Sequence, residues 1–179
     1  MIVAETMLAG AYLLDLERRE DPRGFFARLW CAEELASAGL DTRISQVNVG
    51  FSRRRGTVRG MHFQRAPQAE VKLVRCTAGA VYDVIVDLRP ESPTHRQWLG
   101  IELTAENHRQ LYVPEGFAHG YQALTDAAEI CYQTSMPYAP ESATGVRFDD
   151  PAFGINWPER VTVISDADRS WPDYVEESP

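Results

Sequence analysis

The sequence predicts a mainly β protein, either an antiparallel β-barrel or a jelly roll, with a few short peripheral helices. Several short segments alternate apolar and polar residues with the period of a β-strand. In addition, 11 prolines and 12 glycines divide the 179-residue chain into short pieces. Many short strands separated by turn residues are typical of sandwiches and barrels. The length suits one domain, residues 1–179, and we find no linker or internal repeat.

The segment AVYDVIVDL, residues 80–88, is the clearest strand, because one set of alternate residues is wholly apolar and the other mixes aspartate with valine and isoleucine. Further strands are expected at 57–64, 71–76, 109–114 and 129–136. Turns are expected at 77–80 and over PEGFAHGY, 114–121. These assignments place most of the middle of the chain in strands.

Helical patterns are weak. Residues 31–40 fit about two helical turns ending near Gly39, and residues 104–110 fit a turn or a short helix. From about residue 137 the chain is rich in proline and aspartate, so we expect this tail to wrap the barrel. The helices are therefore expected at the periphery.

The formal net charge of -8 makes the chain a poor general binder of nucleic acid or of an anionic membrane. Any bound anion must meet a local basic patch, and the best candidate is the arginine cluster at residues 53–59. The three cysteines are odd in number and form no CxxC pair, which favours a reducing cytoplasm. The first 20 residues have no basic segment before an apolar run, so they do not resemble a signal peptide or a membrane span.

His62 lies in the predicted strand that contains RGMHFQ. On a regular strand it shares a face with Gly60 and Gln64, and Gly60 leaves room for a ligand to approach the backbone. The alternative is a strand histidine satisfied by a neighbouring hydrogen bond. His119, in the predicted turn PEGFAHGY, has the same two interpretations, because histidines are common in surface turns.

Two other polar residues lie in predicted strands. Lys72 stands between Val71 and Leu73, so it is either an edge-strand lysine that reaches solvent or a fixed charge on the inner wall of a barrel. An inward ammonium suits the stabilisation of an oxyanion. Tyr132 is either a core aromatic with a satisfied hydroxyl or a general acid directed into the barrel.

A metal site is disfavoured by the histidine spacing. Zinc and non-haem iron need two or three nitrogen or sulfur ligands brought together, and the four histidines are widely separated with no His-x-His pair. The arginines suggest a different ligand. Bidentate arginines suit phosphate, and Arg23 in DPRGFF stands beside aromatics able to stack on a base. A nucleoside diphosphate satisfies both features, although a charge run is also the usual mark of a solvated turn.

Five segments occur in the order seen in one known family. They are DPRGFF (21–26), SQVNVGFSRRRGTVRGMHFQ (45–64), VKLVRCTAGAVYDVIVDLRPESPTHRQWLGIEL (71–103), RQLYVPEGFAHGY (109–121) and FDDPAFGINWP (148–158). The chain resembles the dTDP-4-dehydrorhamnose 3,5-epimerase family and its nucleotide-sugar epimerase relatives over nearly its whole length. The resemblance implies a jelly roll of the cupin class without metal or other cofactor, usually a homodimer, and a nucleoside-diphosphate 4-keto-6-deoxyhexose as substrate.

The resemblance also implies roles for particular residues. His62 matches the catalytic base, Lys72 and Tyr132 match a catalytic lysine and tyrosine, and Asp168 matches the carboxylate that orients the histidine, with Asp166 as a weaker alignment. Substrate-binding roles are implied for Arg23, Phe26, Gln46, Asn48, Arg59, His119 and Tyr138. A catalytic set and a binding set are thus both expected.

These residue types suit the implied chemistry. Carbons 3 and 5 flank the 4-ketone, so removing either proton gives an enolate, and a neutral histidine is a suitable base near pH 7. A carboxylate fixes the histidine tautomer, a lysine stabilises the enolate oxygen, and a tyrosine hydroxyl returns a proton to the opposite face. No redox cofactor is needed, and the chain has no GxGxxG fingerprint.

One residue departs from the family pattern. Two positions beyond the second phenylalanine of DPRGFF the family commonly has an acidic residue, and here that residue is Arg28. We expect this region to contact the nucleotide base, from the same chain or from a neighbouring subunit, so the charge reversal at Arg28 bears on the thymine preference. Three alternatives stay open: a 3-epimerase of a secondary-metabolite pathway, a non-catalytic cupin that binds a sugar nucleotide, and a metal-dependent cupin.

Overall fold

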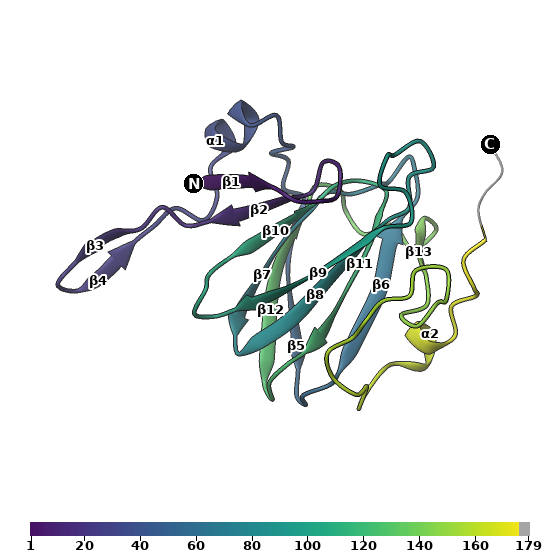
Figure 1. Ribbon diagram of the computed structural model, residues 1–179. Coiled ribbons are helices and arrows are strands. Elements are labelled where there is room, and N and C mark those ends of the chain that lie inside the picture. The colour runs from purple at the N-terminus through teal and green to yellow at the C-terminus, as the bar shows by residue number, and fades with distance from the viewer. Residues whose placement is uncertain (176–179) are drawn as a thin grey trace.

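The computed structural model describes residues 1–175 and has two antiparallel sheets that face each other as a jelly roll (Figure 1). The six strands of the first sheet are, in spatial order, β1 (Ile2–Glu5), β2 (Tyr12–Asp15), β10 (Gln110–Val113), β7 (Lys72–Ala78), β12 (Ala128–Thr134) and β5 (Gln46–Ser52). The five strands of the second sheet are β13 (Ala143–Gly145), β6 (Val58–Gln64), β11 (Phe117–Ala123), β8 (Ala80–Asp87) and β9 (Trp98–Thr104). The predicted fold class is confirmed.

Two short helices and one hairpin lie outside these sheets. Strands β3 (Arg19–Asp21) and β4 (Gly24–Phe26) form a hairpin that projects away from both sheets (Figure 1). Helix α1 (Ala32–Ser37) is slightly shorter than the expected two turns, and the chain leaves it at Gly39, whose φ is +74°. Helix α2 (Asp166–Arg169) is in the C-terminal segment. None of the described helices is long and apolar enough to cross a membrane.

The main core fills the space between the two sheets. Leu111 and Ile130 from the first sheet meet Val81, Ile85 and Leu103 from the second, and all five are at most 1% exposed. Burial of such side chains stabilises the fold by roughly 1.5–3 kcal/mol each. The apolar parts of the two inner faces therefore hold the sheets together.

Strand β8 is buried on both faces. Val81 and Ile85 point into the main core, whereas Val84 and Val86 pack in a second cluster with Phe153 of the C-terminal segment. The wholly apolar face predicted from the sequence is thus the outer face, which the tail covers. The mixed face, with its two aspartates, is the one that points between the sheets.

The predicted turn at PEGFAHGY is wrong in its second half. The turn ends at Gly116, whose φ of +80° allows the tight reversal, and β11 begins at the next residue. His119 is therefore in the middle of a strand, paired with β8 on one side and β6 on the other. It is 7% exposed, so it is not a surface-turn histidine.

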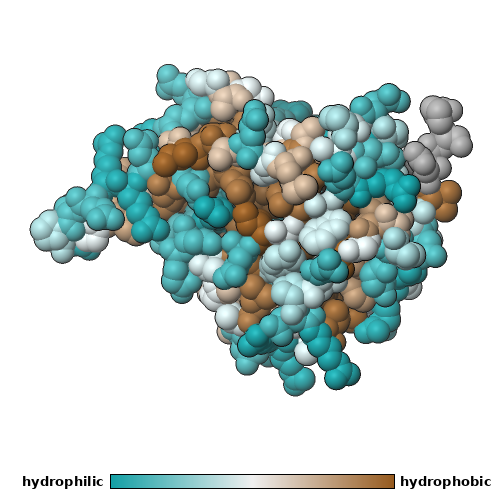
Figure 2. All heavy atoms as spheres, in the orientation of Figure 1, coloured by the Kyte–Doolittle hydropathy of each residue, from teal (hydrophilic) through white to brown (hydrophobic). Residues whose placement is uncertain are grey.

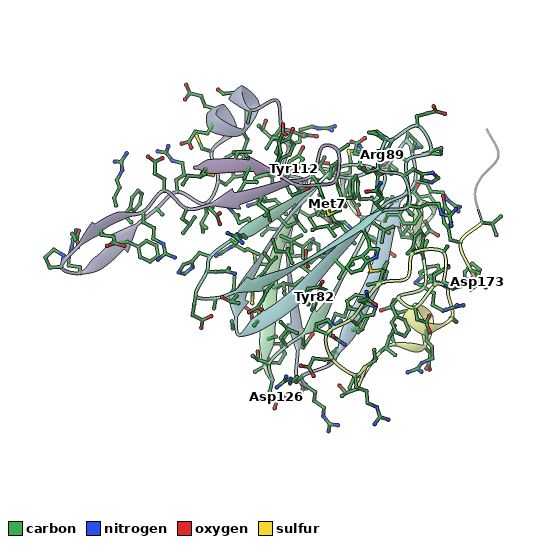
Figure 3. The ribbon with its side chains drawn as sticks, viewed as in Figure 1. Met7, Tyr82, Arg89, Tyr112, Asp126 and Asp173 are labelled. Carbon is green, nitrogen blue, oxygen red and sulfur yellow. The ribbon has the colours of Figure 1, made fainter. Side chains whose placement is uncertain are left out.

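Asp87 organises the loop between β8 and β9. Its fully buried carboxylate accepts hydrogen bonds from Arg89, Ser92 and Thr94 at 2.5–2.8 Å. Arg89, labelled in Figure 3, also stacks over the ring of Phe117, 4.6 Å from its centroid. This network closes one end of the jelly roll, while Asp126 marks the other end in the same view.

Candidate active site

A cavity of about 880 Å³ opens between the two sheets. Its wall comes from β5, β6, β7, β11 and β12, and from the C-terminal segment that carries α2. Eight of the residues expected at a site are in this wall, together with the tail carboxylate. They are His62, Lys72, Tyr132, Gln46, Asn48, Arg59, His119 and Tyr138, with Asp168 from the tail.

His62 and Asp168 form a direct pair, although they are far apart in the sequence. The Nε2 atom of His62 lies 2.6 Å from Oδ1 of Asp168, and Oδ2 accepts the backbone N–H of Gly60 at 3.3 Å. The histidine side chain is 48% exposed toward the cavity, whereas the carboxylate side chain is only 9% exposed. This arrangement leaves the imidazole accessible to a ligand while its partner is shielded from water.

Burial alone would raise the pKa of Asp168, but hydrogen bonds from His62, Gly60 and Ser165 hold that pKa below its ordinary value. Ser165 is also the N-cap of α2, and its hydroxyl accepts the N–H of Asp168 at 3.0 Å. The carboxylate is therefore ionised near neutral pH and fixes the tautomer of His62. Asp166, the weaker alignment, is not in the cavity wall.

The role expected for Gly60 is wrong. A Cβ atom there would lie 2.5 Å from the Cα of Gly120 on β11, so the space beside Gly60 is filled by backbone and not by a ligand. The pairing of β6 with β11 shifts register at this point. Because of the shift, Arg59 and His62, which a regular strand would place on opposite faces, both line the cavity.

Lys72 lies on the inner wall and does not reach solvent, because β7 is a central strand between β10 and β12. Its Nζ donates to the backbone oxygen of His62 at 3.1 Å and lies 3.1 Å from Oε1 of Glu70. Burial lowers the pKa of Lys72, and the charges of Glu70 and Asp83 oppose that effect. The net result is a lowered pKa of Lys72, and the site holds a buried lysine amine with a carboxylate partner.

A second histidine–carboxylate pair lies deeper in the site. Nε2 of His119 is 2.9 Å from Oδ1 and 3.1 Å from Oδ2 of Asp83, and Asp83 is fully buried. Both residues point inward from adjacent strands of the second sheet. His119 is therefore oriented by a carboxylate, as His62 is.

Tyr132 faces the cavity from β12, in the sheet opposite to the one that carries His62. Burial raises the pKa of its hydroxyl, and the negative charge of Glu70 raises it further. The hydroxyl is consequently protonated throughout the neutral range. Nearby, Oε1 of Gln46 accepts the backbone N–H of Tyr138 at 3.0 Å, which places Tyr138, 65% exposed, at the rim.

The structure does not bring Arg23 and Phe26 to this cavity. They lie on the projecting β3–β4 hairpin, where Arg23 pairs with Asp21 and Phe26 is 68% exposed. Figure 2 shows this hairpin standing out from the body of the molecule, with hydrophobic surface near its base. In a single chain, the side chains of this hairpin therefore do not reach the cavity.

Most of the arginine cluster is also outside the cavity. Residues 53–55 form the turn between β5 and β6, where Arg55 pairs with Glu159 and its backbone N–H donates to Asp126. Only Arg59 reaches the cavity wall, and it donates to the backbone oxygen of Phe51 at 2.9 Å. The solvated-turn interpretation therefore holds for residues 53–55.

Arg28, the departure from the family pattern, is neutralised locally. It pairs with Glu34 of α1, and the same carboxylate receives the N-terminal ammonium of Met1 at 2.6 Å. The sequence reasoning missed Glu70 and the pairing of Asp83. Glu70 stands two residues before Lys72, the spacing that places side chains on one face of an extended chain, and Asp83 was on the mixed face of its strand.

The arrangement has three basic side chains, each paired with a carboxylate: His62 with Asp168, His119 with Asp83, and Lys72 with Glu70. Among the described residues, no group of three or more His, Cys, Asp or Glu side chains is placed to hold a metal ion. Chemically, the cavity offers an accessible imidazole base, a buried cation and a protonated phenol on the opposite sheet. Such a set suits proton transfer at a carbon beside a carbonyl group.

Comparison with known proteins gives a consistent result. The family model described as dTDP-4-dehydrorhamnose 3,5-epimerase matches residues 5–176. A dTDP-4-dehydrorhamnose 3,5-epimerase of Sinorhizobium fredii is 46% identical over 161 residues, covering 87% of this chain and 80% of that protein. A dTDP-4-dehydrorhamnose 3-epimerase of Streptomyces niveus is 39% identical over 163 residues, covering 90% and 78%.

Among solved structures, that of dTDP-4-dehydrorhamnose 3,5-epimerase from Bacillus anthracis, with TDP and PPi bound, superposes with a TM-score of 0.92. It is 42% identical, and the alignment covers 97% of this chain and 99% of that one. Fold, cavity and sequence thus lead to one conclusion: the chain is an isomerase that belongs to the dTDP-4-dehydrorhamnose 3,5-epimerase family.

Proposed function

We propose that this enzyme inverts carbons 3 and 5 of dTDP-4-dehydro-6-deoxyglucose and produces dTDP-4-dehydrorhamnose. The observation that carries the proposal is the placement of His62, with its carboxylate partner, and Tyr132 on opposite sheets of one cavity. A hexose ring between them meets a base on one face and an acid on the other. Inversion at carbon requires these two groups on opposite faces.

In this proposal His62 removes the proton from carbon 3, and the electron pair of that C–H bond forms the enolate of the neighbouring ketone. Asp168 stabilises the imidazolium that results. Lys72 supports the enolate oxygen, and Tyr132 delivers a proton to the opposite face of the carbon. The same steps at carbon 5 complete the reaction, with no net oxidation or reduction.

Substrate binding is assigned to the residues around this core. Arg59 supplies a positive charge for the diphosphate, and His119, held by Asp83, supplies a hydrogen bond to the sugar. Gln46, Asn48 and Tyr138 extend the wall toward the rim. The thymine preference remains part of the proposal, because Arg28 carries the charge opposite to the one the family commonly has there.

We also propose that the enzyme is a homodimer. Arg23 and Phe26 lie on a hairpin directed away from their own cavity, so they contribute to catalysis only in the cavity of a second copy (Figure 1). The outer face of the edge strand β5 supports the same assignment, because Val47, Val49 and Phe51 are 46–64% exposed there. A row of exposed apolar residues on an edge strand is typical of an association surface.

A cytoplasmic location belongs to the same proposal. All three cysteines are free in the structure, and Cys76 is buried, which suits a reducing compartment. The nucleotide-sugar substrate that we propose is a small soluble metabolite.

Proton NMR of dTDP-4-keto-6-deoxyglucose in deuterated water tests the function. Loss of the signals from both carbons, with the L-lyxo product appearing, is the expected result. Exchange at carbon 3 alone would make the enzyme a 3-epimerase, the activity named for the Streptomyces niveus relative. Binding without exchange at either carbon would make the chain a non-catalytic protein that binds sugar nucleotides. If the protein shows no binding and no exchange, sugar nucleotides with bases other than thymine should be tested next.

A further inference from the structure

Glu70 is the one carboxylate of the cavity wall to which the mechanism above gives no role. It lies in the loop just before β7, and its side chain is 9% exposed. Its Oε1 is 3.1 Å from Nζ of Lys72. A carboxylate is rarely buried to this extent without a charged partner or a function.

We propose that Glu70 is a positioning residue of this site, which holds the ammonium of Lys72 charged and aimed into the cavity. The proposal rests on the proposed function, because it concerns the group that stabilises the enolate.

The contacts of the Lys72 ammonium leave one of its hydrogen-bond donors for a ligand. An ammonium has three donors. One is directed to the backbone oxygen of His62 at 3.1 Å, and a second to Glu70 at the same distance. The third is left for an oxygen in the cavity, such as that of an enolate. Glu70 thereby fixes Lys72 relative to the strand that carries the base.

The charge of Lys72 needs this support because burial acts against it. Burial lowers the pKa of Lys72, and Glu70 is the largest of the influences that raise it again. The titratable groups around Lys72 come from four strands and the preceding loop. They are His62 on β6, Asp83 on β8, His119 on β11, Tyr132 on β12 and Glu70 itself.

The sequence offers a direct probe, because Lys72 is the only lysine among the 18 lysines and arginines of the chain. Protein labelled with ¹³C at the lysine ε-carbon gives one side-chain resonance, whose titration reports the pKa of Lys72 without any assay. In Glu70→Gln we expect that pKa to fall by on the order of one unit or more relative to the wild type. Glu70→Asp, which keeps the charge, should recover part of the shift.

The matched control is Glu102→Gln, which removes one negative charge from an exposed position on β9. We expect it to leave the Lys72 titration unchanged. An identical Lys72 titration in Glu70→Gln and the wild type would overturn the proposal, and so would a shift of equal size in Glu102→Gln. Because this readout needs no substrate, it separates failure of the proposal from failure of the proposed function.

The activity readout is the pH profile of deuterium exchange into the substrate. In Glu70→Gln the alkaline limb should move to lower pH and kcat should fall by about 10–100-fold, with KM little changed. A higher KM with an unshifted limb would mean that Glu70 only binds substrate, and would overturn the positioning role. If Glu70→Gln does not fold, the same comparison between Glu70→Asp and the wild type decides the question.

Discussion

At the scale of single residues, the cavity is governed by carboxylates that have little contact with solvent. Asp168 and Glu70 have side chains that are 9% exposed, and Asp83 is fully buried. In such surroundings a charge interacts with its partner more strongly than it does in water. The buried carboxylates therefore act strongly on the side chains that they contact.

Replacing the base should abolish proton removal. His62→Gln places an amide N–H near the position of Nε2, the atom that contacts Asp168, but has no basic nitrogen, so we expect deuterium exchange at carbons 3 and 5 to fall by about 10²–10⁴-fold. The control is His108→Asn, in the turn before β10, where φ is +55° and asparagine is tolerated. A His62→Gln enzyme that exchanges at near-normal rates would show that another group is the base.

Tyr132→Phe should separate exchange from inversion. His62 still removes a proton and returns deuterium to the same face, whereas delivery to the other face is lost. NMR should therefore detect deuterium incorporated with retained configuration, and the ratio of exchange to epimerisation should rise.

Because burial and Glu70 raise the pKa of Tyr132, the wild type should lose no Tyr132-dependent activity below about pH 10. Tyr82→Phe, on the outer face of β8 (Figure 3), should behave as the wild type, and equal loss of exchange and inversion in Tyr132→Phe would contradict the assignment.

At the scale of elements, the C-terminal segment that follows β13 supplies Asp168, the partner of His62. This segment adds no strand to either sheet. The buried side chain of Gln122 on β11 anchors it, since Nε2 donates to the oxygen of Glu159 and Oε1 accepts its N–H, both at 2.9 Å. Next, Val58 donates its N–H to the oxygen of Val163 at 2.9 Å. These bonds carry the chain to Ser165 and hence to Asp168.

Gln122→Leu should loosen this segment selectively. It leaves the backbone groups of Glu159 without their partner in a part-buried place, at a cost of about 1–3 kcal/mol in the free energy of unfolding. Hydrogen exchange followed by mass spectrometry should show faster exchange over residues 159–170, together with lower kcat. Gln110→Leu is the matched control, because that buried amide donates instead to the oxygen of Leu29 at 2.7 Å. Equal effects of both variants on the tail would refute the anchoring role.

At the scale of the whole molecule, β5 has two different faces. Gln46, Asn48 and Gly50 line the cavity, while Val47 and Phe51 alternate with them on the outside. If the outer face is covered by a second copy, as we propose, the binding site and the interface are separated by the thickness of one strand. The hairpin that carries Arg23 and Phe26 would then complete the partner's cavity.

Val47→Asp should disrupt that association. Val47 is 60% exposed, so the change costs the single chain little, but in a symmetric interface it buries a charge twice. We expect sedimentation analysis to give a dissociation constant at least about tenfold higher than that of the wild type. Val175→Asp, at a 78% exposed tail position, is the control. A wild type that sediments as a monomer would refute the dimer, and so would an unchanged equilibrium in Val47→Asp.

The sequence was informative where a local pattern decides the structure. Alternation predicted β8, and the position of Lys72 on an inner wall was one of two stated possibilities. Prediction from the sequence failed where pairing between distant segments decides the structure. The shift between β6 and β11 that brings Arg59 and His62 together depends on both strands, and the inward direction of His119 depends on β8. The short strands β1 to β4 have too few residues to show a period, and the seven-residue edge strands β5 and β9 were not predicted either.

The burial of Lys72 has a consequence for chemical labelling. The chain's single side-chain amine is only 8% exposed, so reagents that acylate amines meet no lysine on the outside of the folded protein. Acylation of Lys72 requires the strands around it to part or the reagent to enter the cavity. The extent of that reaction, read by mass, would therefore report how often the jelly roll opens, and its suppression by a bound nucleotide sugar would report how fully the cavity is occupied.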